Sequence, residues 1–217
     1  MKAPGIYELY AYSPGPNSYI GNPNLKPEKS QGWEAGFDQT FGRDFAVVGI
    51  TYFHSDLKDE IFTDFVGVNF AASPANRTTD STRRGVEFSA TVRPVKPLRI
   101  DVAYAHLKAE EGGRQEVRRP PNVGSVNIDY RGADDRWGTN LTVRYNGDQN
   151  DSNFTLTGPP IAVLPAYTLV NLGADVRMKG ALRLYGRIEN ALDKKYEEVY
   201  TYRTAGRGVY VGLKGTF

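Results

Sequence analysis

Apolar and polar side chains alternate along most of this chain. In the last twelve residues, GRGVYVGLKGTF, Val209, Val211 and Leu213 fall on one face, whereas Tyr210 and Lys214 fall on the other. A period of two predicts a β-strand whose two faces meet different surroundings. The same pattern predicts about nine strands, at residues 31–41, 45–54, 85–93, 98–105, 124–131, 137–145, 168–176, 182–189 and 206–217.

One of these segments does not show which face is which. Residues 45–54 (FAVVGITYFH) are apolar at almost every position. We assign its outer face to Ala46, Val48, Ile50 and Tyr52.

The connections between the strands alternate between tight turns and long polar loops. The tight turns are 42–44, 94–97, 132–136 and 178–180, and the long loops are 55–84, 108–121, 147–165 and 190–205. Sorting of this kind is typical of outer-membrane barrels, which have short periplasmic turns and long external loops. The loop at 55–84 contains two short apolar pieces and is expected to carry its own hairpin.

The two faces of the strands collect different residues. Next to the tight turns, the apolar face carries the aromatic side chains expected of a membrane girdle: Phe41, Tyr130, Trp137 and Phe217. The opposite face carries many charges: Glu34, Asp38, Glu87, Arg93, Arg99, Asp101, Asp129, Arg144, Asp175, Arg183, Arg187 and Glu189. Because so many charges cannot line a dry core, they indicate a wet or filled lumen. The predicted fold is therefore all-β, an antiparallel transmembrane β-barrel.

Composition leaves little room for catalysis. The chain has no cysteine and two histidines, and its 27 Lys and Arg residues nearly balance 25 Asp and Glu residues. We therefore expect no catalytic residues, no metal site, no cofactor and no nucleic-acid partner. No run approaches the roughly 18 apolar residues of a membrane helix. Adjacent acidic residues in the loops are expected to be solvated: Asp59/Glu60, Glu110/Glu111, Asp134/Asp135 and Glu197/Glu198.

Several stretches together resemble the barrel of a TonB-dependent outer-membrane receptor. They are KAPGIYELY at 2–10, GNPNLKPE at 21–28, GVEFSATVRP at 85–94, IENALDKKYEEVY at 188–200 and YRTAGRGVYVGLKGTF at 202–217. The TAGR in the last stretch is similar to the vitamin B12 receptor branch, and siderophore receptors share the rest. The resemblance implies the C-terminal part of a 22-stranded barrel. It divides the chain into an external loop segment at 1–30 and barrel strands at 31–217, with the plug domain absent.

The resemblance also implies a function that needs no catalysis by the receptor. Loops capture a metal chelate such as a siderophore or cobalamin at the outer membrane, and TonB supplies energy through the plug. Outer-membrane lipid and the barrel assembly machinery, which reads the C-terminal strand, are the other implied partners. Aromatic and cationic loop residues suit flat, anionic chelates, and the candidates are Tyr7, Tyr10, Tyr12, Tyr19, Tyr200, Tyr202 and Arg203.

Two other classes of protein fit the alternation. One is a small stand-alone barrel that acts as a passive outer-membrane channel or surface protein, and the other is a soluble β-sandwich binding module. In the fragment interpretation, the final strand presents an unpaired edge. Pairing of that strand with residues 31–41 would instead mean that the nine strands close on themselves.

Overall fold

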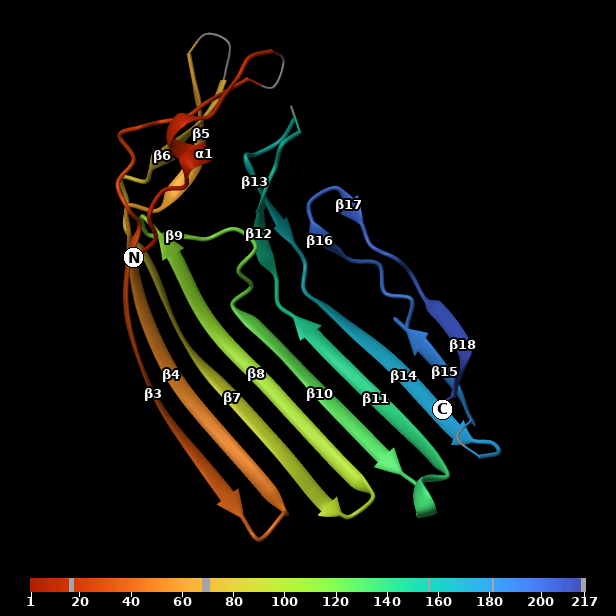
Figure 1. Ribbon diagram of the computed structural model, residues 1–217. Helices are drawn as coiled ribbons and strands as arrows, with labels where there is room; N and C mark the ends of the chain where they lie inside the picture. The colour runs from red at the N-terminus through yellow and green to blue at the C-terminus, as the bar shows by residue number, and fades with distance from the viewer. Residues whose placement is uncertain (16–17, 68–70, 156, 181, 216–217) are drawn as a thin grey trace. The chain divides into compact units, whose positions relative to one another are not determined.

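The computed structural model describes residues 1–15, 18–67, 71–155, 157–180 and 182–215. Nine long strands form one antiparallel sheet (Figure 1). They are β3 (Lys29–Phe41), β4 (Ala46–Lys58), β7 (Ser81–Val95), β8 (Leu98–Glu111), β10 (Asn122–Arg131), β11 (Trp137–Asn146), β14 (Tyr167–Arg177), β15 (Leu182–Glu189) and β18 (Gly208–Gly215). Each strand pairs with its neighbours in the chain, in the order β18-β15-β14-β11-β10-β8-β7-β4-β3. The predicted nine-strand meander is confirmed.

Shorter elements occupy the connections. They are α1 (Ile6–Tyr10), β1 (Tyr12–Ser13), β2 (Tyr19–Ile20), β5 (Ile61–Val66), β6 (Ala71–Asn76), β9 (Arg114–Gln115), the 3-10 turn η1 (Ala133–Asp135), β12 (Gln149–Ser152), β13 (Ile161–Leu164), β16 (Glu197–Val199) and β17 (Tyr202–Arg203). Among the described helices, none is long and apolar enough to cross a membrane.

The chain divides into two compact units. The loop unit comprises Met1–Glu34, Phe53–Arg84 and Lys108–Gln115, and the sheet unit comprises Ala35–Tyr52, Gly85–Leu107 and Glu116–Phe217. Several strands are longer than predicted: β7 begins at Ser81 and β8 continues to Glu111. Ser81–Arg84 of β7 and Lys108–Glu111 of β8 belong to the loop unit, where the strands continue although the apolar alternation has ended.

Within the sheet unit, the register separates apolar rows from polar rows. Ile100, Ile128, Leu141, Leu172, Ile188 and Val209 are successive partners across six strands. The next row consists of Arg99, Asp129, Asn140, Gly173, Arg187 and Tyr210. Because neighbouring rows point to opposite faces, one face of the sheet is apolar and the other is polar, as predicted.

The apolar face is open to the surroundings. On β18, 66% of Val209, 74% of Val211 and 63% of Leu213 are exposed. A soluble sandwich would bury such a face against a second sheet, and a wide exposed apolar surface marks an interaction site or a membrane. These rows therefore favour contact with lipid over the soluble-sandwich alternative.

The structure supports the register assigned to residues 45–54 in the second half of this segment but not at Ala46 and Val47. A Cβ atom on Gly49 would meet the side chains of Asp38 and Ser89, and one on Gly36 would meet the Thr51 hydroxyl. Gly49 and Thr51 therefore lie on the polar side, and Ile50 and Tyr52, which alternate with them, are exposed. Ala46 has the assigned parity but is buried, whereas Val47 is exposed.

The loop unit is built around a small sheet of its own, ordered β1-β2-β6-β5. β5 and β6 form the hairpin expected within 55–84, and Tyr19 of β2 pairs in parallel with Ala72 of β6. The GNPNLKPE stretch joins these parts, because Asn76 accepts a hydrogen bond from the Lys26 amide (2.7 Å) and donates one to the Lys26 carbonyl (2.9 Å). Residues 1–30 thus fold together with the hairpin, and their external location stays a prediction.

Candidate ligand-binding site

The last long connection forms one wall of a concave site in the sheet unit. β16 and β17 pair as a hairpin, with Val199 opposite Tyr202. The Thr204 hydroxyl donates to the Tyr196 carbonyl (2.7 Å), and the Thr201 amide donates to Glu197 Oε2 (3.1 Å). These bonds hold the hairpin tip in a defined shape.

We call the concave site the loop hollow; its volume is about 620 Å³. Its walls are Arg118, Ser152, Phe154, Thr155, Glu198, Val199, Tyr200, Thr201, Tyr202, Arg203 and Thr204. These described residues supply two arginines, three aromatic rings, several hydroxyl groups and one carboxylate. Such a lining can stack on a flat ligand and pair with its negative charge.

A buried carboxylate lies behind this wall. Asp151 is 0% exposed and accepts hydrogen bonds from Arg118, Ser152 and Tyr200. Burial alone would raise the pKa of Asp151, but hydrogen bonds from the Tyr200 amide, the Arg118 guanidinium and the Ser152 amide outweigh burial and lower that pKa. Asp151 therefore carries a negative charge at neutral pH.

The structure brings three of the candidate residues together. Tyr200, Tyr202 and Arg203 all line the loop hollow. Their role in binding a ligand stays a prediction.

The four candidate tyrosines of the first segment lie in the loop unit. Tyr7 and Tyr19 form a ring pair, with centroids 4.7 Å apart, whereas Tyr10 and Tyr12 are 69% and 72% exposed. Burial, followed by the neighbouring Tyr7 and Glu8, raises the pKa of Tyr19, so its phenol stays protonated at neutral pH. A ring pair therefore joins two of these four side chains, Tyr7 and Tyr19.

Phe41, Tyr130 and Trp137 of the proposed girdle lie at the ends of strands beside the tight turns. The rings of Tyr130 and Trp137 face each other across β10 and β11, with centroids 5.2 Å apart, and Phe41 ends β3. Phe217 lies outside the described residues. Contact of these rings with the membrane interface stays a prediction.

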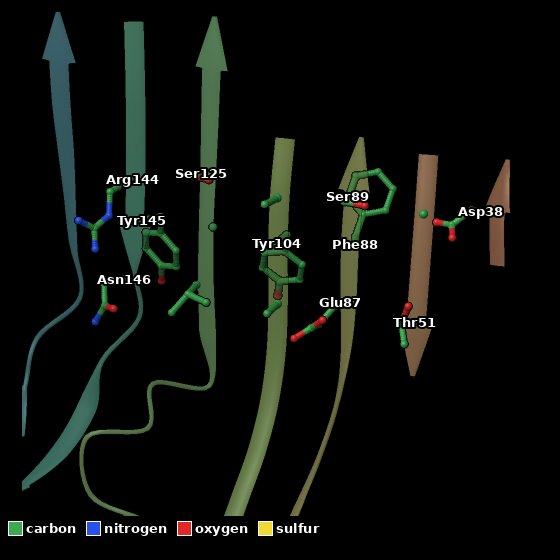
Figure 2. A pocket seen from close by; sticks show the side chains of 15 residues that line it. Asp38, Thr51, Glu87, Phe88, Ser89, Tyr104, Ser125, Arg144, Tyr145 and Asn146 are labelled. Atoms are coloured by element: carbon green, nitrogen blue, oxygen red, sulfur yellow. The ribbon is translucent and has the colours of Figure 1, made fainter. Parts of the chain in front are cut away.

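The polar face of the sheet unit has a groove of its own, of about 550 Å³ (Figure 2). Figure 2 shows Asp38 and Glu87 on one side of it and Arg144 on the other, several strands away. The lining also includes small residues such as Ala103 and Ser125 and larger ones such as Tyr104. Opposite charges that line a groove on this face agree with the predicted wet or filled lumen.

The expectation that the adjacent loop acids are only solvated was wrong for each pair. Glu60 accepts from the Ser81 hydroxyl, and Glu111 pairs with Arg77. Asp135 pairs with Arg177 at 2.9 Å, and Glu198 accepts from the Tyr167 hydroxyl at 2.9 Å. Partners that are distant in the sequence cannot be seen from the acids themselves. Within the described ranges, no cluster of three or more His, Cys, Asp or Glu residues is placed to hold a metal ion.

Sequence reasoning missed Arg118, Phe154 and Asp151. All three lie in polar loops without periodicity, so no local pattern distinguishes them from solvated neighbours. The hollow brings together loops that are 33 and 49 residues apart in the chain.

Comparisons with known proteins agree with this architecture. The model of a family described as "TonB dependent receptor-like, beta-barrel" matches residues 1–191. Similar solved structures include the iron transporter FrpB of Neisseria meningitidis (17% identity, TM-score 0.71, covering 88% of this chain and 31% of that one). The copper transporter OprC is also similar (16% identity, TM-score 0.74, covering 100% and 35%).

A third similar structure is the ferric-catecholate import receptor Fiu of E. coli K12 (17% identity, TM-score 0.71, covering 96% and 30%). At these identities the likeness shows the fold alone, and this chain spans about a third of each receptor (31%, 35% and 30%). The family match, in contrast, covers most of the sequence. The chain therefore belongs to the TonB-dependent receptors, which are β-barrel transporters of the outer membrane and not enzymes.

Proposed function

We propose that this chain serves in the TonB-dependent uptake of a metal chelate, such as a siderophore or cobalamin. The observation that carries the proposal is the loop hollow, where Arg118 and Arg203 lie with the rings of Phe154, Tyr200 and Tyr202. Many metal chelates are flat and negatively charged, so cations and aromatic faces can hold them together.

Two observations support two different chelate classes for this chain, cobalamin and iron chelates. TAGR at residues 204–207 is similar to the vitamin B12 receptor branch. Fiu is named as a ferric-catecholate import receptor, and FrpB as an iron transporter. We therefore propose both classes of chelate as probes of the site.

The proposed partners follow from the same architecture. The exposed apolar rows of the sheet suit outer-membrane lipid. TonB acts on a receptor through a plug domain, and the assembly machinery reads a C-terminal strand such as β18. Each of these three interactions is a proposal for this chain.

Binding of two probes by the chain in detergent micelles tests the proposed function. We expect iron(III) tris-catecholate or cyanocobalamin to bind, and Arg203→Ala to weaken the anionic iron complex about tenfold, since one charged hydrogen bond is lost. Tyr202→Ala should weaken either probe by a few-fold through lost stacking. Isothermal titration calorimetry measures both effects.

Lys195→Ala is the matched control. Lys195 lies in the same connection, and its ammonium pairs with Asp193 at 3.2 Å, outside the lining of the hollow. Its removal should leave both affinities unchanged. Equal losses in Lys195→Ala and Arg203→Ala would contradict a ligand site in the hollow.

The alternatives from other classes make different predictions. A passive channel would conduct ions across a planar lipid bilayer without any chelate, and a soluble module would be recovered in the aqueous fraction without detergent. An upstream reading frame that encodes a plug and continues into this one would support the receptor.

A further inference from the structure

Asp151 joins three connections that are far apart in the sequence. Its Oδ1 accepts hydrogen bonds from Arg118 Nε (2.7 Å) and the Ser152 amide (2.8 Å), and its Oδ2 accepts one from the Tyr200 amide (2.7 Å). Arg118 lies between β8 and β10, Asp151 between β11 and β14, and Tyr200 between β15 and β18. One carboxylate thus holds three consecutive long loops.

Because the Asp151 carboxylate is buried, protein donors must take the place of water as its hydrogen-bond partners. A buried carboxylate is costly unless donors surround it, and an ionised carboxylate can only accept hydrogen bonds. Asp151 therefore needs all three donors. In turn, its carboxylate fixes the positions of the Arg118 guanidinium and the Tyr200 amide. A neutral side chain of the same size cannot satisfy the same donors.

All three donors belong to residues that line the loop hollow, and two of them, Arg118 and Tyr200, lie on other loops than Asp151. Arg118 uses Nε for Asp151, which leaves its two terminal nitrogens as further donors, and the side chain is 46% exposed. The Tyr200 backbone is held at the point where its side chain joins the wall of the hollow. Asp151 itself does not line the hollow.

Neighbouring contacts hold the same junction from both sides. The Arg118 amide donates to the Asn150 carbonyl (2.7 Å), and Gln149 Nε2 donates to the Glu198 carbonyl (3.1 Å). β12 therefore contacts the first loop through Asn150 and the last loop through Gln149. Among these contacts, the Asp151 carboxylate is the group that reaches both loops.

We propose that Asp151 is a positioning residue of the loop hollow, which orients Arg118 and Tyr200 toward a ligand that Asp151 does not touch. The role in ligand binding rests on the proposed function. The positioning of the two loops can be tested without any ligand.

Hydrogen exchange of the chain in detergent micelles tests the positioning. Asp151→Asn replaces one acceptor oxygen by an NH2 group. The orientation that keeps an oxygen at the Oδ1 position still accepts from Arg118 Nε and the Ser152 amide, and it leaves the Tyr200 amide without an acceptor. We expect the amides of residues 149–153 and 197–204 to exchange at least tenfold faster. Asp193→Asn is the control: Asp193 accepts from the Arg207 amide (2.9 Å) in the same connection, outside the hollow. Unchanged exchange of the Tyr200 amide in Asp151→Asn would overturn the proposal.

Affinity for iron(III) tris-catecholate tests whether Asp151 acts through Arg118. Asp151→Asn and Arg118→Ala should each weaken binding about tenfold. The double variant should be weaker than Arg118→Ala by clearly less than tenfold, because only the effect through Tyr200 remains. If the double variant loses about a hundredfold in affinity, the product of the two single losses, Asp151 and Arg118 act independently. That result would overturn the positioning role. If the unsubstituted chain binds neither probe while exchange changes as expected, the proposed function fails and the hold of Asp151 on the loops stands.

Discussion

At the scale of single residues, glycines on the polar face make room for side chains of the neighbouring strand. Gly212 of β18 lies opposite Tyr185 of β15, and a Cβ atom on Gly212 would fall 2.5 Å from the Tyr185 hydroxyl oxygen. Two pairs further along, on the same face, the Arg187 guanidinium lies 4.5 Å from the centre of the Tyr210 ring. A glycine within a strand often marks such a close approach.

Substitution of Gly212 is the first prediction. Gly212→Ala should force the Tyr185 ring from its place and lower the free energy of unfolding by about 1 kcal/mol, the lower end of overpacking costs. Gly186→Ala is the matched control, because its nearest atom would be 3.7 Å away, an ordinary contact. That control should be neutral or stabilising by about 0.5 kcal/mol, since alanine restricts the unfolded chain. Urea titration in lipid vesicles measures both, and equal stability of the two variants would contradict the explanation.

At the scale of elements, the GNPNLKPE stretch is a connector within the loop unit. The Gly21 amide donates to the Ala11 carbonyl (2.7 Å), and the Asn22 amide donates to the Glu8 carbonyl (2.9 Å) at α1. At its other end, the Glu28 side chain accepts from the Ile61 amide at the start of β5 (2.8 Å). The stretch therefore links the N-terminal helix to the β5–β6 hairpin.

The connector predicts a strong effect at Gly21. A Cβ atom there would lie 2.7 Å from the Tyr10 nitrogen and 2.8 Å from the Leu9 carbonyl oxygen. Both are backbone atoms, which cannot move without distorting the chain around α1. Gly21→Ala should destabilise the packing of α1 by about 2 kcal/mol, seen as faster exchange of the Asn22 amide. Asn24→Ala is the control, since Asn24 is exposed and its contact to Asn22 uses the backbone. Equal exchange in both variants would count against the connector role.

At the scale of the whole molecule, the sheet of nine strands has two edges. β3 and β18 are the ends of the strand order, and no pairing between them is seen in the described ranges. Edge strands carry unpaired backbone groups that natural proteins usually cover. Because the number of strands is odd and neighbours are antiparallel, β3 and β18 run in the same direction, so direct closure would require a parallel seam.

Disulfide trapping tests whether the sheet is open. Because the sequence contains no cysteine, only the introduced cysteines can form a disulfide. Phe37→Cys and Val211→Cys place one cysteine on each edge strand. A disulfide needs Cα atoms within about 7 Å, so in an open sheet this pair should form no intramolecular disulfide in outer membranes. Cysteines at Gly186 and Val211, which are register partners, are the positive control. A cross-link within one chain between positions 37 and 211 would show that the nine strands close on themselves.

Much of the fold was predictable because its signals are local. Period-two alternation identified all nine long strands and both faces, and turn residues such as Gly42 and Gly180, each with positive φ, mark tight turns. The extension of β8 to Glu111 was not predictable, since backbone pairing needs no apolar pattern. Of the candidate site, the sequence indicated Tyr200, Tyr202 and Arg203 but not the Arg118 and Phe154 that share their hollow.

By itself, the sequence determined the strand pattern, the apolar and polar faces, the sorted connections and the resemblance to the family. Only the tertiary structure decided which loops meet, and therefore that Asp151 is a buried junction and not a solvated acid. The physical reason is distance along the chain. Alternation arises between residues two apart, whereas the environment of a loop side chain depends on donors such as Tyr200, 49 residues away from Asp151.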